Sequence, residues 1–324
     1  MMEIPATPFN LTRRELIARA MLGAALAGAT SCVSRVSTTS FFAGQDLPIG
    51  VQLYTVSDAA REDLPGTFLR LAQIGFKTVE LAGYHGHTPS ALKAAADRAG
   101  LKLVSADLPA IARDNGPSLT GDLARLADDL HVLGISQIVL SSYPPPSRVG
   151  PVGPNEAFQD YRIRVAAAMR EEDWKATADF LNEKSAALRI EGIALGYHNH
   201  NPEFASVDGT TGFDILMRET DPSIFFELDV GWVVAGGADP VSLLNRYAPR
   251  IRMMHVKDIA ATTKTNYLLA QDPTEVGRGI VDWRRVLPTA YAAGIRHFFV
   301  EQEPPFRQGR FEALADGFAY LSSL

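Results

Sequence analysis

The chain has 324 residues, of which 46% are hydrophobic and 21% are charged, and this balance is typical of a globular protein. The formal net charge of −6, without any basic run, argues against a nucleic-acid-binding surface. The one cysteine, Cys32, excludes an internal disulfide bond, and no apolar run reaches the roughly 18 residues that a membrane-spanning helix needs.

Residues 1–32 have the pattern of an export signal. Arg13 and Arg14 precede a short stretch rich in Ala and Gly, which is typical of a bacterial twin-arginine signal. An amphipathic helix from Thr12 is the alternative, although glycines would weaken it. The run Ala29-Thr30-Ser31-Cys32 also resembles a lipoprotein processing site, which would make Cys32 a lipid anchor. We therefore expect an exported protein, periplasmic or anchored to the envelope, that meets the membrane only through this lipid.

Residues 33–46 are rich in Ser and Thr and are interpreted as a linker, so the predicted catalytic domain covers residues 47–324. Within this domain a helical stretch repeatedly ends in glycine and leads through an apolar residue into a strand. Glycine adopts the left-handed conformation that ends a helix. The instances are Gly75-Phe76, Gly100-Leu101, Gly134-Ile135, Gly192-Ile193 and Gly294-Ile295. Such repetition is typical of alternating strands and helices.

Eight apolar runs are predicted as strands, because parallel strands buried on both faces are apolar throughout. They are residues 49–55, 78–82, 102–106, 137–141, 193–198, 224–229, 252–257 and 297–301. Helices between them are predicted from apolar stripes, such as Leu64, Phe68, Leu71 and Ile74, or Leu123, Leu126, Leu130 and Leu133. The alternation predicts a single-domain (β/α)8 TIM barrel. A doubly wound open sheet is the alternative, but the Gly-rich turn usual after its first strand is missing.

In such a barrel the active site lies where the strands end. Polar residues collect there, namely Glu80, His198, His200, Glu203, Glu227, Asp229, His255, Lys257, Glu301 and Glu303. Side chains two residues apart on a strand share a face. Each such pair therefore has one member deeper in the barrel and one nearer its mouth, the open end where the strands end. Converging carboxylates and imidazoles repel or lose hydration unless a cation neutralises them. We therefore predict one divalent metal ion, held by His198, Asp229, His255 and Glu301, with His200 as the alternative to His198 because both share a face of the fifth strand. Manganese is favoured, with zinc, cobalt, iron or magnesium as other candidates.

From Gly50 to Leu321 the chain resembles the sugar isomerase/epimerase superfamily of xylose-isomerase-like barrels. The carriers are Gly50-Val51-Gln52-Leu53-Tyr54, Val79-Glu80-Leu81-Ala82-Gly83-Tyr84, Leu195-Gly196-Tyr197-His198-Asn199-His200, Phe226-Glu227-Leu228-Asp229-Val230-Gly231-Trp232, His255-Val256-Lys257-Asp258, Val276-Gly277-Arg278-Gly279-Ile280-Val281-Asp282-Trp283 and Val300-Glu301-Gln302-Glu303. The resemblance implies Asp229, His255 and Glu301 as metal ligands. The glutamate that epimerases carry on strand five falls at or near His198. The His-Asn-His form resembles the branch of inosose dehydratases and enzymes of 3-keto-sugars.

We also predict roles for the other side chains at the strand ends. Protons and substrate hydroxyls are assigned to Glu80, His200, Glu203, Lys257 and Glu301, and substrate binding to Tyr54, Asp107, Trp232 and Arg278, with Tyr54 and Trp232 expected to stack on the sugar face. Plain alternatives remain for several of them. Tyr54 and Trp232 would pack the mouth, Lys257 would neutralise a neighbouring carboxylate, and Arg278 would be a solvated loop charge.

The function implied is that of a divalent-metal-dependent sugar isomerase or epimerase acting through an enediolate. Export favours a non-phosphorylated sugar or keto-sugar, because phosphorylated sugars are mainly cytoplasmic. The first alternative is a metal-dependent lyase or hydrolase of the same superfamily, a dehydratase or keto-glycoside eliminase. The second is a non-catalytic exported sugar-binding protein. The small-molecule partner is a carbohydrate in each case, and a homo-oligomer is compatible with all three.

Overall fold

The computed structural model describes residues 40–112 and 116–324. The predicted signal, residues 1–32, and the first half of the predicted linker, residues 33–39, lie outside these ranges. From Ser40 onward the chain belongs to one compact unit that extends to Leu324. Its first element is the short helix α2 (Phe41–Gly44), whose Phe42 is buried against Phe298, with ring centroids 5.5 Å apart. The end of the predicted linker is therefore packed on the barrel through its aromatic rings.

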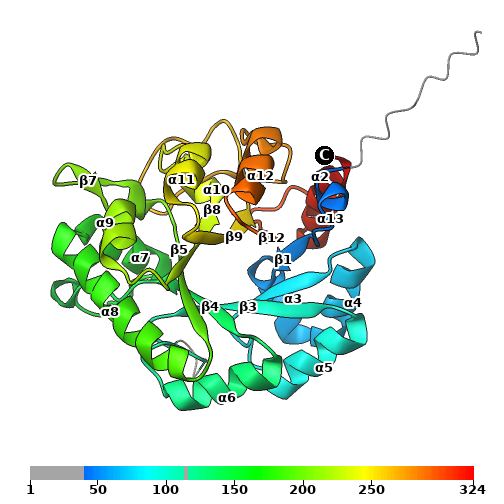
Figure 1. Ribbon diagram of the computed structural model, residues 1–324, viewed down its shortest axis with the longest axis horizontal. Coiled ribbons are helices and arrows are strands. Elements are labelled where there is room, and N and C mark those ends of the chain that lie inside the picture. Colours follow the sequence, from blue (N-terminus) through cyan, green and yellow to red (C-terminus); the bar gives the residue numbers. More distant parts are fainter. Residues whose placement is uncertain (1–39, 113–115) are drawn as a thin grey trace, which may run out of the picture. The chain divides into compact units, whose positions relative to one another are not determined.

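Eight parallel strands close into a barrel in the order β1-β12-β9-β8-β5-β4-β3-β2, as predicted (Figure 1). They are β1 (Gly50–Gln52), β2 (Thr78–Ala82), β3 (Lys102–Pro109), β4 (Gln137–Ser142), β5 (Ala194–His198), β8 (Phe225–Asp229), β9 (Ile251–Val256) and β12 (His297–Val300). The first strand is shorter than the predicted residues 49–55. The side chain of Gln52 accepts a hydrogen bond from the backbone N of Tyr54 at 3.0 Å and begins the 3-10 turn η1 (Leu53–Val56).

Helices surround the strands (Figure 1). They are α3 (Ser57–Glu62), α4 (Leu64–Ile74), α5 (Pro89–Ala99), α6 (Leu123–Leu133), α7 (Phe158–Ala168), α8 (Glu171–Ile190), α9 (Gly212–Glu219), α10 (Val230–Ala235), α11 (Pro240–Tyr247), α12 (Trp283–Ala292) and α13 (Arg310–Ser323). The predicted helix-ending glycines all have positive φ, for example 69° at Gly100 and 72° at Gly134. None of the described helices is both long and apolar enough to cross a membrane.

Below the polar side chains at the strand ends, the barrel interior is apolar. Val104, Val139, Phe225, Met253 and Phe299 form a buried cluster of their own. Gly196 leaves the space that the ring of Phe225 fills, since a Cβ there would lie 2.5 Å from that ring. Phe225, Met253 and Phe299 each stand two residues before an acidic or imidazole side chain on the same strand face. The polar side chains therefore form the layer directly above this cluster.

Loops at the carboxyl ends of the strands carry shorter elements. The 3-10 turns η2 (Ser147–Val149) and η3 (Pro202–Phe204) follow β4 and β5, and β6 (Ser206–Val207) pairs with β7 (Thr210–Thr211). A second pair joins β10 (Asp258–Ile259) to β11 (Pro273–Thr274). Asp258 fastens the loop after β11, because its Oδ2 accepts hydrogen bonds from the backbone N of Gly277 at 3.0 Å and from Nε1 of Trp283 at 3.1 Å. These hydrogen bonds join the His255–Asp258 motif to the Val276–Trp283 motif.

Candidate metal centre

The deepest polar layer of the barrel is built on Glu80. In the register of the first three strands Gln52 lies beside Glu80, and Glu80 beside Ser105. Nε2 of Gln52 donates a hydrogen bond to Oε1 of Glu80 at 2.6 Å, and the hydroxyl of Ser105 donates to Oε2. All three side chains are buried. Glu80, predicted to handle protons, is thus held at both oxygens.

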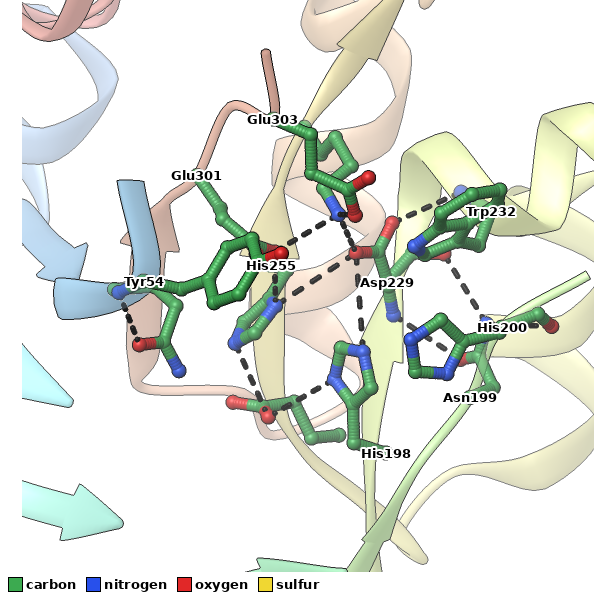
Figure 2. A network of polar contacts seen from close by, with 12 residues as sticks. Tyr54, His198, Asn199, His200, Asp229, Trp232, His255, Glu301 and Glu303 are labelled. Atoms are coloured by element: carbon green, nitrogen blue, oxygen red, sulfur yellow. Dashed lines mark hydrogen bonds and ion pairs between the residues drawn. The ribbon is translucent and has the colours of Figure 1, made fainter. Parts of the chain in front are cut away.

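His255 joins this layer to the mouth of the barrel (Figure 2). Its Nε2 lies 2.7 Å from Oε1 of Glu80 and 3.2 Å from Oε2 of Glu227. Its Nδ1 lies 2.8 Å from Oε2 of Glu301 and 3.7 Å from Oδ2 of Asp229. Burial by itself lowers the pKa of His255, but the carboxylates of Glu227 and Glu301 outweigh it and raise this pKa well above its usual value. The imidazole therefore bridges a deep and a shallow set of carboxylates.

The shallow set fits a divalent cation. His198, Asp229 and His255 offer ligand atoms that all lie within 4.8 Å of one another. Oδ1 of Asp229 accepts a hydrogen bond from the backbone N of Trp232 at 2.9 Å, whereas the buried Oδ2 lies 4.0 Å from Nε2 of His198 and 3.7 Å from Nδ1 of His255, with Nζ of Lys257 at 3.1 Å as its ion-pair partner. Two imidazoles around one carboxylate oxygen form a donor set that can hold a cation. Imidazole and carboxylate donors suit Zn, Mn, Co or Fe(II). With Glu301 against His255, the structure brings the four predicted ligands together.

The deep set is a second group of this kind. Ligand atoms of Glu80, Glu227 and His255 also lie within 4.8 Å of one another. Burial and then the neighbouring Glu80 raise the pKa of Glu227 well above its usual value. Glu227 has no predicted role of its own. Its signal was a carboxylate inside an otherwise apolar strand, two residues before Asp229.

Lys257 is buried among three carboxylates. Its Nζ lies 3.1 Å from Oδ2 of Asp229 and 3.0 Å from both Oε2 of Glu301 and Oε1 of Glu303. Burial lowers the pKa of Lys257, but these carboxylates outweigh it and raise the pKa well above its usual value. The ammonium group therefore stays charged at neutral pH and does not accept a proton. Of the two roles predicted for Lys257, neutralisation of the carboxylates is the one that this geometry supports.

Three further predicted side chains line the mouth (Figure 2). The ring of His200 lies 5.0 Å from that of His198 and 5.5 Å from that of Trp232. Trp232 is only 2% exposed, which fits a wall of the site better than an open stacking platform. Tyr54 is half-exposed, and burial followed by Glu303 and Glu301 raises its pKa. Tyr54 is thus the predicted stacking residue that a ligand can reach.

Arg162 is a side chain that the sequence analysis missed. It lies on α7, within the long connection from β4 to α8, and its Nη2 is 3.4 Å from Nε2 of His200. A guanidinium group only donates hydrogen bonds, so Nε2 of His200 accepts and the proton of the neutral ring is on Nδ1. No motif in the sequence marks Arg162, because only packing brings α7 to the mouth.

Three predicted site residues stand apart from the cluster around His255. Asp107 is half-buried on β3, and burial followed by the nearby Glu80 raises its pKa to about 7. Glu203 is buried and accepts a hydrogen bond from the hydroxyl of Tyr197 at 2.5 Å. Arg278, predicted to bind substrate, is exposed and pairs with Asp316 of α13 at 3.3 Å. That contact matches the solvated loop charge that was the alternative for Arg278.

Glu203 leads to a prediction about stability. Burial raises its pKa from 4.5 to about 7, so the contribution of the neutral form is complete below pH 4.5 and is lost as the pH rises through about 7. We expect Glu203→Gln to remove a loss of about 3 kcal/mol that the parent protein suffers between pH 5 and pH 8. Urea unfolding of both proteins at the two pH values measures it. Parallel pH dependence in the two proteins would contradict the expectation.

Comparisons with known proteins agree with this architecture. A family model described as a xylose isomerase-like TIM barrel matches residues 68–324. An inosose dehydratase from Clostridium beijerinckii is 30% identical over 217 residues, which cover 66% of this chain and 70% of that protein. A crystal structure named as a sugar phosphate isomerase/epimerase, from Parabacteroides distasonis, is 25% identical with a TM-score of 0.67 and covers 85% of this chain and 97% of that one.

A further solved structure shows likeness of fold alone. It is a xylose isomerase-like TIM barrel protein from Mycobacterium smegmatis in complex with magnesium, 14% identical with a TM-score of 0.58. The alignment covers 86% of this chain and 96% of that one. The family model spans well over half of the chain, including the strand ends that carry all four predicted metal ligands. The chain therefore belongs to the xylose isomerase-like TIM barrel family.

Proposed function

We propose that the protein is a divalent-metal-dependent lyase of a neutral keto-sugar, which removes a proton beside the carbonyl and eliminates an oxygen from the next carbon. The observation that carries this proposal is the asymmetry of the site. Carboxylates stand at the ends of β2, β8 and β12, whereas β5 ends in the imidazoles of His198 and His200. Burial lowers the pKa of His198 to about 3 and that of His200 well below its usual value, so both imidazoles are neutral and suited to bind a metal ion. Epimerisation by two opposed carboxylates is therefore less well supported than a one-sided elimination.

The metal ion would be held by His198, Asp229, His255 and Glu301. When bound, it supplies Lewis acidity to the carbonyl and hydroxyl oxygens of the substrate. The donor chemistry described above supports this, and so does the fold, since the Mycobacterium smegmatis barrel of the same fold was crystallised with magnesium. Manganese remains our first choice among the candidates, because two imidazoles with two carboxylates suit it better than magnesium.

Glu301 is the proposed proton acceptor. Burial alone would raise its pKa, but the charges of Lys257 and His255 outweigh it and hold this pKa well below its usual value. Glu301 is therefore ionised, whereas burial and Glu80 raise the pKa of Glu227, on the other side of His255, well above its usual value. Environments that push the pKa values of two carboxyl groups apart in this way are typical of acid–base sites. The C–H bond breaks toward Glu301, the electron pair forms the carbon–carbon double bond, the bond to the β-oxygen breaks, and the proton leaves with that oxygen.

The charge of the site supports a neutral substrate. The acidic side chains around it are Glu80, Glu227, Asp229, Glu301 and Glu303, and Asp107 lies nearby. The positive charges are those of the proposed metal ion, His255, Lys257 and Arg162, and all but Arg162 face these carboxylates. A phosphate group would therefore find little uncompensated positive charge here. A free keto-sugar needs none, because its hydroxyls donate to carboxylates.

Proton exchange tests the proposal directly. We expect metal-loaded protein in heavy water to exchange the C–H proton beside the carbonyl of a keto-sugar and to release an unsaturated product, with both followed by NMR. Glu301→Gln should lower both rates by about 100-fold or more, the usual loss for a general base. Absence of exchange with every metal and keto-sugar tried would contradict the proposal and favour a sugar-binding protein.

A sugar isomerase or epimerase is the second candidate. It is favoured by the Parabacteroides distasonis structure, whose name describes that activity at 25% identity. The inosose dehydratase from Clostridium beijerinckii, at 30% identity, favours the lyase instead. The same NMR experiment separates them, because exchange with a rearranged or inverted sugar, and no unsaturated product, would select the isomerase.

Export is a separate proposal that rests on residues 1–32 alone. The paired arginines before an Ala/Gly-rich stretch support a twin-arginine signal, and Cys32 supports lipidation. Cell fractionation should then recover the protein from the periplasm or the envelope. Recovery from the cytoplasm with the first methionine intact would contradict this location.

A further inference from the structure

Beside the metal centre lies a cavity of about 550 Å³, which we call the side pocket. It is formed by the connection between β4 and α8 together with the segment after β3, and its lining includes Ile111, Tyr143, Val152, Phe158 and Val165. Its volume is in the range usual for small-molecule sites. Among the described residues that line it, Arg162 is the one with a permanent charge. The pocket is thus mainly apolar, unlike the metal centre.

The side pocket and the metal centre share a wall at His200. His200 and Arg162 line the pocket, and their side chains contact each other at 3.4 Å. The other edge of the His200 ring faces His198, a predicted metal ligand, with ring centroids 5.0 Å apart. A ligand whose polar ring sits over His198 and His200 therefore has its far end directed to the pocket.

Apolar side chains at the pocket are left in contact with solvent. Ile111 is 54% exposed, and Val152 and Phe158 are each 41% exposed. All three line the pocket. Contiguous exposed apolar surface around a concave site is typical of a binding surface. Burying this apolar surface under an apolar group of the ligand stabilises a complex, whereas a sugar ring alone leaves the surface in contact with water.

The walls of the pocket are tied in place by ion pairs. Arg164 binds both carboxylate oxygens of Glu156, with Nε to Oε1 at 2.8 Å and Nη2 to Oε2 at 2.7 Å. Nη1 of Arg148 binds Oδ1 of Asp173 at the start of α8 at 2.6 Å. A wall held in this way needs little rearrangement on binding, which favours a ligand that fits a preformed shape.

We propose that the substrate is a glycoside-like keto-sugar that carries an aromatic or similarly apolar ring, and that the side pocket binds this ring. The inference deepens the proposed function and rests on it for the polar half of the ligand. Prolines and aromatic side chains in the wall suit a flat ring, and Arg162 lies where the linking oxygen would pass. The pocket therefore determines specificity for the group attached to the sugar.

Equilibrium binding of a matched pair of ligands tests this assignment. Phenyl and methyl glycosides of glucose lack the ketone, so they bind without reacting, and calorimetry on the metal-loaded full chain gives both affinities. We expect the phenyl glycoside to bind at least about tenfold more tightly, since one buried ring is worth that much or more. Equal affinities, or no detectable binding of either glycoside up to millimolar concentration, would overturn the proposal.

Two variants of exposed apolar residues at the rim of the side pocket, with a matched control, test whether the phenyl preference arises there. Ile111→Asp and Val152→Asp should reduce the phenyl preference to less than about twofold and leave the stoichiometry of bound metal unchanged. Val132→Asp is the control, because Val132 is 48% exposed on α6 and does not line the pocket. Retention of the full preference in both rim variants would place the ring elsewhere and overturn the assignment.

The outcomes separate the pocket from the proposed reaction. A phenyl preference without any proton exchange on keto-sugars supports the pocket and contradicts the lyase. Exchange and elimination without a phenyl preference support the lyase and contradict the assignment of the pocket. If a second copy of the chain covers the apolar rim instead, light scattering will show a dimer that Val152→Asp dissociates, and no phenyl preference will be seen.

Discussion

Asp229→Asn is expected to weaken the binding of divalent metal ions by at least about 100-fold, more than is usual for loss of a side chain that only supports a ligand. The substitution keeps Oδ1, which caps α10 through the backbone N of Trp232, and replaces the buried Oδ2 that faces His198 and His255. The fold should therefore persist while one ligand oxygen is lost. Elemental analysis of dialysed protein and titration calorimetry measure the change.

Glu303→Gln is the matched control for this loss. Glu303 also contacts Nζ of Lys257, at 3.0 Å, but its side chain is 26% exposed and it belongs to neither of the two candidate ligand groups among the described residues. Its substitution should change the metal affinity by less than about tenfold, as expected for a partly exposed charge that is not a ligand. Full metal occupancy at parental affinity in Asp229→Asn would refute the metal centre.

Lys257→Met is expected to destabilise the metal-free protein by about 3–5 kcal/mol at pH 7, the usual result of breaking a buried ion pair. The ammonium group lies within 3.1 Å of carboxylate oxygens from Asp229, Glu301 and Glu303, so its loss leaves buried negative charge without compensation. A divalent ion should restore part of this stability, because it brings positive charge to the same oxygens. Urea unfolding with and without metal measures both effects.

Lys93→Met provides the comparison for an exposed pair. Nζ of Lys93 lies 2.6 Å from Oδ1 of Asp97 one helical turn away, and both side chains are well exposed. Its loss should cost less than about 0.5 kcal/mol. If Lys257→Met costs no more than Lys93→Met, neutralisation of the buried carboxylates is not the role of Lys257.

Local patterns in the sequence were sufficient to predict the barrel. Continuous apolar runs mark strands buried on both faces, and glycines such as Gly100 and Gly134 mark helix ends through positive φ. The predicted strands and helices agree with the structure to within a few residues. The first strand is the exception, since the side chain of Gln52 turns the backbone of Tyr54 out of the sheet, which no pattern of hydrophobicity records.

Strand periodicity also predicted which polar side chains meet. Parallel strands all end at the same rim, so His198, Asp229, His255 and Glu301 had to converge there. Alternation correctly paired Asp229 with Glu227 and His255 with Lys257 on common faces, one deep and one shallow. These predictions needed only distances along single strands.

Contacts across the barrel were beyond the reach of the sequence. The three carboxylates around Lys257, the position of His255 between two sets of carboxylates and the raised pKa of Glu227 depend on distances between different strands. Arg162 and the side pocket depend on how an irregular connection folds back over the mouth. Thus the sequence by itself determined the fold, the family and the rim on which the ligands lie. Only the tertiary structure decided which groups stay charged and where an apolar group can bind, because electrostatics and cavity shape are set by distances between segments far apart in the chain.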